Sequence, residues 1–321
     1  MINENLKTGL SHINQNVNQN LATINQIFLE NKKVFTSQFN SKHNYEKIAV
    51  NANVNSAISP FLVSKANYQN EIFDNCDIND FDESRIIAKV VLVKYLNYDP
   101  VLLELNSEKR WPIASLTKLM TSIIAIEKIG MEKEIVISAK AISTEGTTGD
   151  FNVGEIYKAG DLIKAMLISS SNDAAAAIAE NFGEKEFIDE MQKKAIGLKM
   201  FQTSYLEPTG LSYINQSTAN DLIKLMNYIE QNYPELLRIS RQKEAGIKEL
   251  KLQFARKIFN INKFAGQSDF VGGKTGYIEE AGRNLIAIFD INGKKILSIV
   301  LGADDSFVET EKIKKFVQSC K

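Results

Sequence analysis

Strand-like apolar runs at both ends of residues 85–321 enclose a helical middle, and this order limits the fold more than any other feature of the chain. The first two runs, Ile86–Leu96 and Val101–Leu105, flank the turn cluster Asn97–Pro100, which is typical of a β-hairpin. Three later runs are expected to be strands: Asp269–Tyr277, Asn284–Ile291 and Lys295–Gly302. The last two are joined by Asn292-Gly293, a strong hairpin signal. The order predicts an α+β protein with an antiparallel sheet.

The segment between these strands has helical periodicity. Apolar side chains such as Leu116, Leu119 and Met120 share one face of a helix predicted over Ser115–Ile129. Further helices are expected at Gly160–Ser169, Asn172–Asn181, Glu184–Ala195 and Thr218–Ile229, with a last one at Val308–Ser319. Helices therefore account for most of the chain between the two groups of strands.

The first 84 residues differ from the rest. Apolar residues recur at spacings of three and four along residues 2–28, which indicates one stripe on a helix. We interpret residues 1–40 as an amphipathic helical extension, 41–84 as an irregular connector and 85–321 as the folded domain. Because asparagine is a poor helix former, two readings of the stripe stay open. The helix either associates with a second copy of the chain or docks on its own domain.

Charge, histidine and cysteine content exclude several classes of protein. A formal net charge of -1 gives no electrostatic reason to expect nucleic acid as a partner. His12 and His43 lie far upstream of the predicted helical block, which argues against a Ser-His-Asp triad. Cys76 and Cys320 are too few for a zinc cluster or a disulfide framework. They either pair in an oxidising compartment or stand as unrelated thiols, and the second reading is favoured. We expect neither a metal nor a cofactor.

No address is evident in the sequence. No stretch reaches the roughly 18 to 20 consecutive apolar residues of a membrane-spanning helix. Residues 1–20 are rich in Asn and Gln and lack the apolar block of a signal peptide.

Three short motifs supply the parts of an acyl-transfer site without histidine. They are Ser115-Leu116-Thr117-Lys118, Ser170-Ser171-Asn172 and Lys274-Thr275-Gly276. Ser115 is the candidate nucleophile, and Lys118, one helical turn on, is the candidate base. A lysine removes a proton only when its ammonium form is destabilised, and burial or a neighbouring cation such as Lys274 does this. Ser170 is expected to relay a proton to the leaving amine.

The remaining motif residues are candidates for holding the substrate. Asn172 can donate to and accept from a substrate amide. Lys274 and Thr275 offer a charge and a hydroxyl to a carboxylate, while Gly276 leaves room for the substrate backbone. The backbone N–H groups of Ser115 and Tyr277 are candidate oxyanion-hole donors.

Each motif also has a bland interpretation, and two have decoys in the same chain. Ser115 suits an ordinary helix N-cap, and residues 169–173 suit a helix-capping loop. Ser-x-x-Lys recurs at Ser240–Lys243, and Lys-Thr-Gly recurs at Lys7–Gly9. Placement separates the pairs, because Ser115 precedes a strongly apolar helix whereas Ser240 lies in a polar stretch. The ordered set of three favours the nucleophile interpretation.

Residues 85–321 resemble the serine-type D-alanyl-D-alanine carboxypeptidases, the low-molecular-mass penicillin-binding proteins. The resemblance rests on the run Pro112–Thr121, on Ser171–Ala175, and on Pro208–Leu211, Ser217–Ala219, Lys274–Tyr277 and Ala281-Gly282. It implies a β-lactamase/transpeptidase-like fold, with a five-stranded antiparallel sheet flanked by helices and an all-helical subdomain. It further implies removal of the terminal D-alanine from peptidoglycan stem peptides through an acyl-enzyme on Ser115, with β-lactams as covalent inhibitors. An extracytoplasmic location is implied by the family alone.

Three departures from the family pattern accompany this resemblance. Many relatives carry a carboxylate-binding arginine after the last strand, where this chain has residues 303–307 without one, and Arg283 or Lys274 is the candidate substitute. The chain also ends soon after the catalytic domain, and it begins with an unfamiliar segment instead of a signal sequence. Two alternatives stay open. A class A β-lactamase would use a glutamate such as Glu207 for deacylation, and a non-catalytic cell-wall scaffold would use the N-terminal helix.

Overall fold

The computed structural model describes residues 86–96, 101–146 and 149–319. The predicted extension over 1–40, the connector over 41–84, the decoy Lys7–Gly9 and both cysteines lie outside these residues. Within the described part of the chain, no helix combines the length and the apolarity that crossing a membrane requires.

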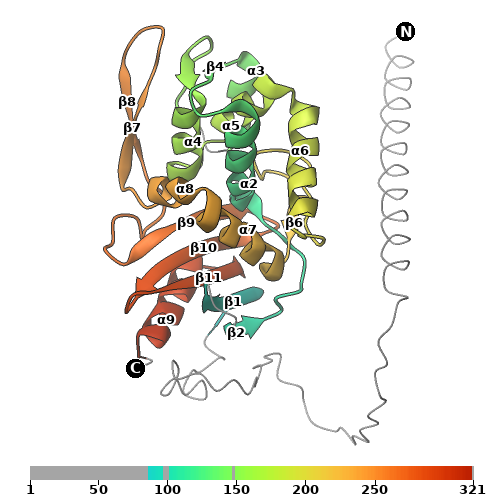
Figure 1. Ribbon diagram of the computed structural model, residues 1–321, viewed down its shortest axis with the longest axis vertical. Coiled ribbons are helices and arrows are strands. Elements are labelled where there is room, and N and C mark those ends of the chain that lie inside the picture. Colours follow the sequence, from blue (N-terminus) through green and yellow to red (C-terminus); the bar gives the residue numbers. More distant parts are fainter. Residues whose placement is uncertain (1–85, 97–100, 147–148, 320–321) are drawn as a thin grey trace, which may run out of the picture. The chain divides into compact units, whose positions relative to one another are not determined.

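A five-stranded antiparallel sheet forms the centre of the fold (Figure 1), as the sequence predicts. Its strands are β1 (Val90–Tyr95), β2 (Val101–Leu105), β9 (Phe270–Ile278), β10 (Gly282–Ile291) and β11 (Lys294–Ala303). The order across the sheet is β2-β1-β11-β10-β9, so the first hairpin pairs with the last strand of the chain. Strand β9, which carries Lys274-Thr275-Gly276, lies at an edge of the sheet.

Helices cover both faces of the sheet, and alternation along β1 shows how. Val90 and Leu92 pack into a large core shared with the main helical layer. Val91 and Val93 point the other way, into a smaller core that includes side chains of the last helix. The main layer holds α2 (Thr117–Ile124), α4 (Ala159–Ile168), α5 (Asn172–Phe182), α6 (Glu184–Gly197) and α7 (Ala219–Asn232), whereas α9 (Ser306–Ser319) lies on the opposite face (Figure 1).

The helix predicted over Ser115–Ile129 consists of three parts. It opens with a 3-10 turn, η3 (Ala114–Leu116), continues as α2 and ends in a π-helical turn, η4 (Ala125–Ile129). The other predicted helices match α4, α5, α6, α7 and α9 to within three residues at each end. Helical periodicity was therefore a reliable guide because each helix buries one apolar face.

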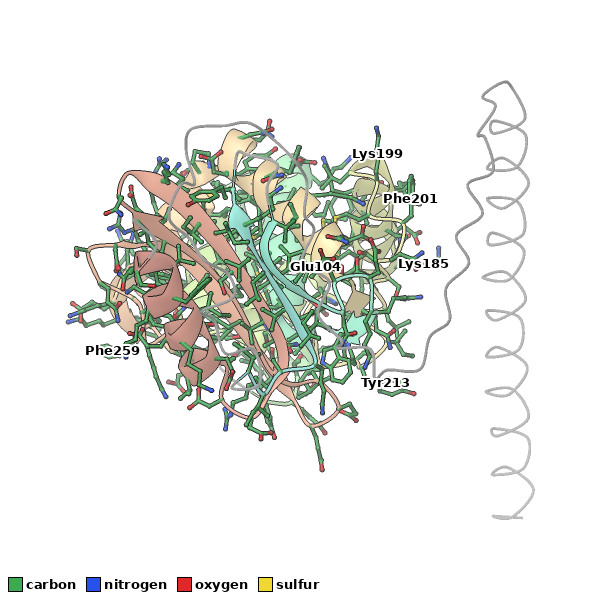
Figure 2. The ribbon with its side chains drawn as sticks, turned by 90° about the horizontal axis from the view of Figure 1, so that it is seen from below. Glu104, Lys185, Lys199, Phe201, Tyr213 and Phe259 are labelled. Atoms are coloured by element: carbon green, nitrogen blue, oxygen red, sulfur yellow. The ribbon has the colours of Figure 1, made fainter. Side chains whose placement is uncertain are left out.

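Several short elements were not predicted. These are α3 (Ala139–Ile142), α8 (Pro234–Ser240) and the strand pairs β3–β6 (Trp111–Pro112 with Gln216–Ser217), β4–β5 (Glu134–Val136 with Ile156–Lys158) and β7–β8 (Glu244–Lys248 with Ala255–Phe259). The β7–β8 pair forms a ribbon separate from the central sheet (Figure 1), and its Phe259 points outward from the body (Figure 2). Only Ile247 and Ile258 of the ribbon's paired residues are buried, so it lacks a strong apolar pattern.

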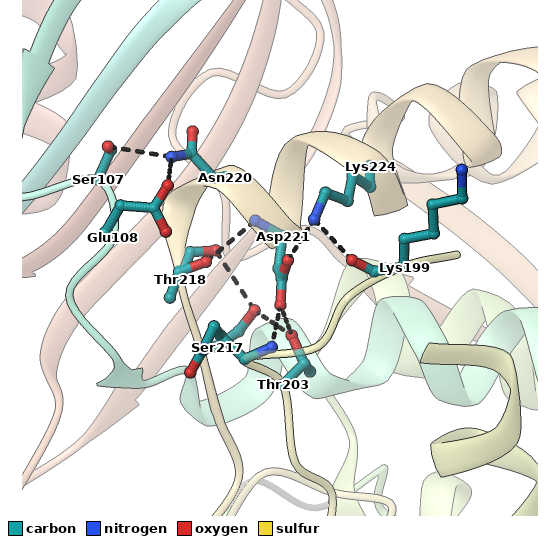
Figure 3. A network of polar contacts seen from close by, with 10 residues as sticks. Ser107, Glu108, Lys199, Thr203, Ser217, Thr218, Asn220, Asp221 and Lys224 are labelled. Carbon is teal, nitrogen blue, oxygen red and sulfur yellow. Dashed lines mark hydrogen bonds and ion pairs between the residues drawn. The ribbon is translucent and has the colours of Figure 1, made fainter. Parts of the chain in front are cut away.

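A buried polar network braces the segment before Ser115 (Figure 3). Asp221 accepts hydrogen bonds from Thr203 Oγ1 at 2.9 Å and from Lys224 Nζ at 2.7 Å, and its backbone N–H donates to Thr218 Oγ1. Ser217 Oγ lies 2.8 Å from Thr203 Oγ1. Because Ser217 is the Cα partner of Trp111 in β3–β6, the network fixes the strand that leads into η3.

Candidate active site

Ser115 sits inside the 3-10 turn, held between two close-packed glycines. Ala114 has a left-handed backbone with φ of 48°, an unusual conformation for a residue other than glycine. A Cβ at Gly210, whose φ is 88°, would lie 2.0 Å from Ala114 O, and one at Gly276 would lie 2.9 Å from Ile113 O. Ser115 is therefore not a helix N-cap, because Ile113 precedes the turn in that position without a side-chain cap bond.

Lys118 brings Ser115 and the second motif together. Its side chain is fully buried in the first turn of α2. Nζ lies 2.9 Å from Ser115 Oγ, 2.6 Å from Asn172 Oδ1 and 2.6 Å from Thr209 O. Three segments distant in the sequence therefore converge on one amine.

The partners of Lys118 suit a neutral amine. Asn172 Oδ1 and Thr209 O can only accept hydrogen bonds, whereas the Ser115 hydroxyl can also donate. Asn172 Nδ2 donates to Glu145 O at 2.8 Å, which orients the amide so that its oxygen faces Lys118. Two N–H groups of a neutral Lys118 can satisfy the two acceptors, and the lone pair then faces the Ser115 hydroxyl. In this arrangement the Lys118 amine can accept the proton of the Ser115 hydroxyl.

The electrostatics of Lys118 favour this protonation state. Complete burial lowers the pKa of Lys118 to about 7, although the carboxylates of Glu207 and Asp173 act in the opposite direction. A substantial neutral fraction is therefore present near neutral pH.

Ser170 and Lys274 form the second half of the site. Lys274 Nζ lies 2.8 Å from Ser170 Oγ and 2.9 Å from Thr275 O. Ser170 itself has a left-handed backbone with φ of 61°. Burial lowers the pKa of Lys274, and the nearby charge of Lys118 lowers it further. The expected repulsion between the two lysines thus acts on Lys274, while burial is what lowers the pKa of Lys118.

The second motif is also a helix cap, as its bland interpretation predicted. Ser171 is the N-cap of α5, and its Oγ accepts from Ala174 N at 3.0 Å. Asp173 accepts a hydrogen bond from Gly149 N at 2.8 Å. Helix capping and contact with Lys118 coexist in this motif because Ser171 performs the first and Asn172 the second. The cap sets the direction of Asn172 at the start of the helix.

Strand β9 brings Gly276 against the turn that carries Ser115. A Cβ at Gly276 would lie 3.1 Å from Ser115 N, so only glycine lets the strand approach this closely. The neighbouring Tyr277 is exposed, and the Arg283 guanidinium lies 5.1 Å from its ring centroid. In the arginine-free loop Asp305 caps α9 instead, with Oδ1 accepting from Phe307 N at 2.9 Å.

The loop over residues 206–215 contributes more than its sequence suggested. The Glu207 carboxylate organises it by accepting hydrogen bonds from Thr209 N, Thr209 Oγ1, Gly210 N, Ser212 N and Asn215 Nδ2. This order places the Thr209 carbonyl on Lys118. Sequence reasoning noted the Pro208–Leu211 match without a role for it, because the contributing atom belongs to the backbone.

The structure separates the decoy from the motif. Ser240 lies at the end of α8, is buried, and accepts from Gly273 N at 3.1 Å, whereas Lys243 is exposed. Among the described residues, no group of three His, Cys, Asp or Glu side chains could hold a metal ion.

Comparisons with known proteins agree on one family. A family model described as D-alanyl-D-alanine carboxypeptidase matches residues 79–305. A D-alanyl-D-alanine endopeptidase of Pseudomonas aeruginosa is 31% identical over 246 residues, which is 74% of this chain and 79% of that protein. The D-alanyl-D-alanine carboxypeptidase DacF of Bacillus subtilis is 31% identical over 63% of this chain and 54% of its own length.

A solved structure agrees with the fold. Penicillin-binding protein D2 from Listeria monocytogenes, in an ampicillin-bound form, superposes with a TM-score of 0.61 and 27% identity. The match covers 71% of this chain and 96% of that one. The predicted penicillin-binding, transpeptidase-like fold is confirmed.

Proposed function

Since this chain belongs to the D-alanyl-D-alanine carboxypeptidase family, we propose that it removes the terminal D-alanine from peptidoglycan stem peptides through an acyl-enzyme on Ser115. One observation carries the proposal. The buried Lys118 amine lies 2.9 Å from Ser115 Oγ and has a pKa of about 7, so a base stands beside a hydroxyl that otherwise lacks nucleophilicity.

In the proposed acylation, Ser115 Oγ attacks the carbonyl carbon of the penultimate D-alanine while Lys118 takes the hydroxyl proton. The carbonyl oxygen becomes an oxyanion that accepts from the backbone N–H groups of Ser115 and Tyr277. Such donors are typically worth about 3 kcal/mol of barrier each. The C–N bond then breaks, and the proton passes from Lys118 through Ser170 Oγ to the leaving amine.

In the proposed deacylation, a water molecule replaces Ser115 as the attacking group, and Ser115 Oγ becomes the leaving group. A water molecule attacks the ester carbon, Lys118 takes a proton from it, and Ser115 Oγ leaves as the hydroxyl after receiving that proton. The products are the shortened stem peptide and the free enzyme. Each half of the proposed cycle returns Lys118 to its neutral state, ready to accept the next proton.

Recognition of the substrate carboxylate is assigned to Lys274 and Thr275. An arriving carboxylate raises the pKa of Lys274, since an opposite charge favours the ammonium form. Arg283, whose Cα partner in β9 is Tyr277, is the proposed substitute for the missing loop arginine. Asn172 is assigned to the substrate amide through the face of its side chain away from Lys118.

A second candidate activity is favoured by the relatives. Proteins named D-alanyl-D-alanine endopeptidase from Pseudomonas aeruginosa and Haemophilus influenzae match at 31% and 33% identity. We therefore keep endopeptidase cleavage of cross-linked stem peptides as the alternative. The β-lactamase alternative is weaker, because both Glu207 oxygens already accept hydrogen bonds from their own loop. The 2.9 Å approach of the buried Lys118 amine to Ser115 Oγ favours an enzyme over a purely non-catalytic scaffold.

Peptidoglycan stem peptides as substrate and β-lactams as covalent inhibitors follow from the same proposal. With them we propose an extracytoplasmic location, because the family acts on peptidoglycan. A homo-oligomer through residues 2–28 stays a prediction from the sequence.

The test incubates the full chain with a stem pentapeptide ending in D-Ala-D-Ala, with a cross-linked dimer, and with fluorescent penicillin. Release of free D-alanine from the pentapeptide supports the carboxypeptidase. Cleavage of the dimer alone supports the endopeptidase, and rapid turnover of penicillin supports the lactamase. A folded protein that acts on none of the three and carries no label excludes every enzymatic candidate.

A further inference from the structure

The β7–β8 ribbon is seated firmly on one face only. Ile247 and Ile258 on its inner face are buried in the main core. At its tip Leu250 N donates to Ile156 O at 2.8 Å, and Ile156 N donates to Glu249 Oε1 at 2.9 Å. Arg256 binds Glu155 at 3.1 Å. These contacts hold the ribbon in one position, so its outer face is a stable surface.

The outer face of the ribbon is exposed and carries a net positive charge. It is formed by Glu244, Gly246, Lys248, Ala255, Lys257 and Phe259, all of them exposed. From residue 238 to 263 the exposed cations are Arg238, Arg241, Lys243, Lys248, Lys251, Lys257 and Lys263, against the single exposed acid Glu244. That acid already pairs with Lys257 at 2.7 Å. Among the described residues, the Lys248 and Lys251 side chains have no ion-pair partner.

Large apolar side chains lie between these cations. Leu252 at the tip is 70% exposed and Phe259 on the outer face is 62% exposed. Phe259 points away from the body at the edge of the molecule (Figure 2). Solvent-exposed leucine and phenylalanine beside lysine are unfavourable in water but suit the boundary between lipid headgroups and acyl chains.

We propose that the outer face and tip of the β7–β8 ribbon bind an anionic membrane surface. The lysines meet the phosphate-bearing headgroups, and Leu252 and Phe259 enter the interfacial layer. The exposed apolar residues favour a lipid surface over a soluble anionic polymer, which would use the cations but leave Leu252 in water. This inference does not depend on the proposed function.

The base of the ribbon connects to the active site. Ile261 N donates to Ile168 O at 3.1 Å, two residues before Ser170. Five-residue strands span about 16 Å, at roughly 3.3 Å per residue. A ribbon bound at its tip would therefore hold the catalytic groups at a defined height over the membrane.

The experiment measures binding of the full chain to vesicles of phosphatidylcholine with and without phosphatidylglycerol, by co-sedimentation. Wild type is expected to bind the anionic vesicles, and the binding should weaken when salt rises from about 50 mM to about 500 mM. The double variant K248E/K251E should bind at least about 25-fold more weakly, at about fivefold per lysine. Leu252→Asp should weaken binding about tenfold without removing a cation.

A matched control reverses two lysines elsewhere. Lys185 and Lys199 are exposed and lie on the other side of the molecule from Phe259 (Figure 2), so K185E/K199E makes the same change in net charge. This control should bind as wild type does. Thermal unfolding of each variant reports that the fold is intact. Ser115→Ala should bind vesicles as wild type does, whether or not the proposed activity is correct.

Several results would overturn the inference. These are no binding of wild type to anionic vesicles at low salt, equal binding to neutral vesicles, an equal loss in the two double variants, or an unchanged affinity in K248E/K251E. Binding to a soluble anionic polymer such as polyglutamate, without binding to vesicles, would replace the membrane by a polymer.

Discussion

Residues 115–118 and 240–243 share the pattern Ser-x-x-Lys, but they differ in the burial and the contacts of the serine and of the lysine. Lys118 is buried and directs Nζ to Ser115 Oγ at 2.9 Å, whereas Lys243 is exposed. Ser240 is buried, and its Oγ accepts a hydrogen bond from Gly273 N. Lys118 lies in helix α2 and is buried in the core, whereas Lys243 follows the end of α8 and is exposed to water. Burial of the lysine, and not the spacing itself, decides which serine has an amine beside it.

The two serines also differ in their backbones. Ser115 follows a left-handed residue in a turn pressed between Gly210 and Gly276. Ser240 closes an ordinary helix, α8. Strain of this kind persists only where the surroundings enforce it, and it presents the Ser115 hydroxyl rather than burying it in a cap.

The largest expected difference between the two motifs comes from removing the hydroxyl of each serine. Ser115→Ala should abolish covalent labelling by fluorescent penicillin, because no acceptor for the acyl group is left. Ser240→Ala should keep the label but lower the free energy of unfolding by about 1–3 kcal/mol, since Gly273 N loses its buried acceptor. Gel fluorescence and chemical unfolding measure the two effects. Persistent label on Ser115→Ala would assign the nucleophile elsewhere.

Removing each lysine should give the next largest difference. Lys118→Ala should slow acylation about a thousandfold, within the usual range for a general base. Lys243→Ala should leave the acylation rate unchanged, because the Lys243 side chain is exposed to solvent. Stopped-flow acylation rates measure both. Similar rates for Lys118→Ala and wild type, with the fold intact, would exclude Lys118 as the base.

A methyl group at each of two glycines tests the packing of the turn. Gly210→Ala should reduce acylation about a hundredfold, since its Cβ would meet Ala114 O at 2.0 Å and displace the nucleophile. Gly246→Ala is the matched control on the outer face of the ribbon, where nothing lies within 4 Å of the added carbon. It should acylate normally. An active Gly210→Ala enzyme would show that the close approach is dispensable.

The smallest expected effect is the change of the acylation rate with pH, which tests the lowered pKa of Lys118. Because the pKa of Lys118 is about 7 and the neutral amine is the active form, the acylation rate should rise with pH and level off above that value. The rate at about pH 6 should be about one tenth of the rate at about pH 8, since the neutral fraction changes by that factor. A profile that is flat across this range would show that Lys118 does not set the rate.

Much of the fold could be predicted because its elements have strong patterns. The five strands of the sheet and the long helices bury continuous apolar faces, so their periods are legible. The β7–β8 ribbon was missed because two buried isoleucines among charged residues do not make a pattern. The pairing of β1 with β11 was equally hidden, because it joins strands about two hundred residues apart in the chain.

The candidate site was predicted in its side chains but not in its backbone. Ser115, Lys118, Ser170, Asn172 and Lys274 are brought together as expected. The Thr209 carbonyl was missed, since every residue carries a carbonyl and the letters do not tell which one a fold will use. Glu207 was considered as a deacylating base, and the structure shows it organising its own loop.

Residue identity is enough to establish which chemical groups are available, their order along the chain, and that both histidines lie upstream of the three motifs. The folded chain is what shows that one Ser-x-x-Lys places its lysine amine beside its serine hydroxyl, and what depresses the pKa of that lysine. Both depend on burial, and burial is set by how α2, the 206–215 loop and β9 pack around one amine. Desolvation acts on a group through everything that excludes water from it, so no local string of residues can encode it.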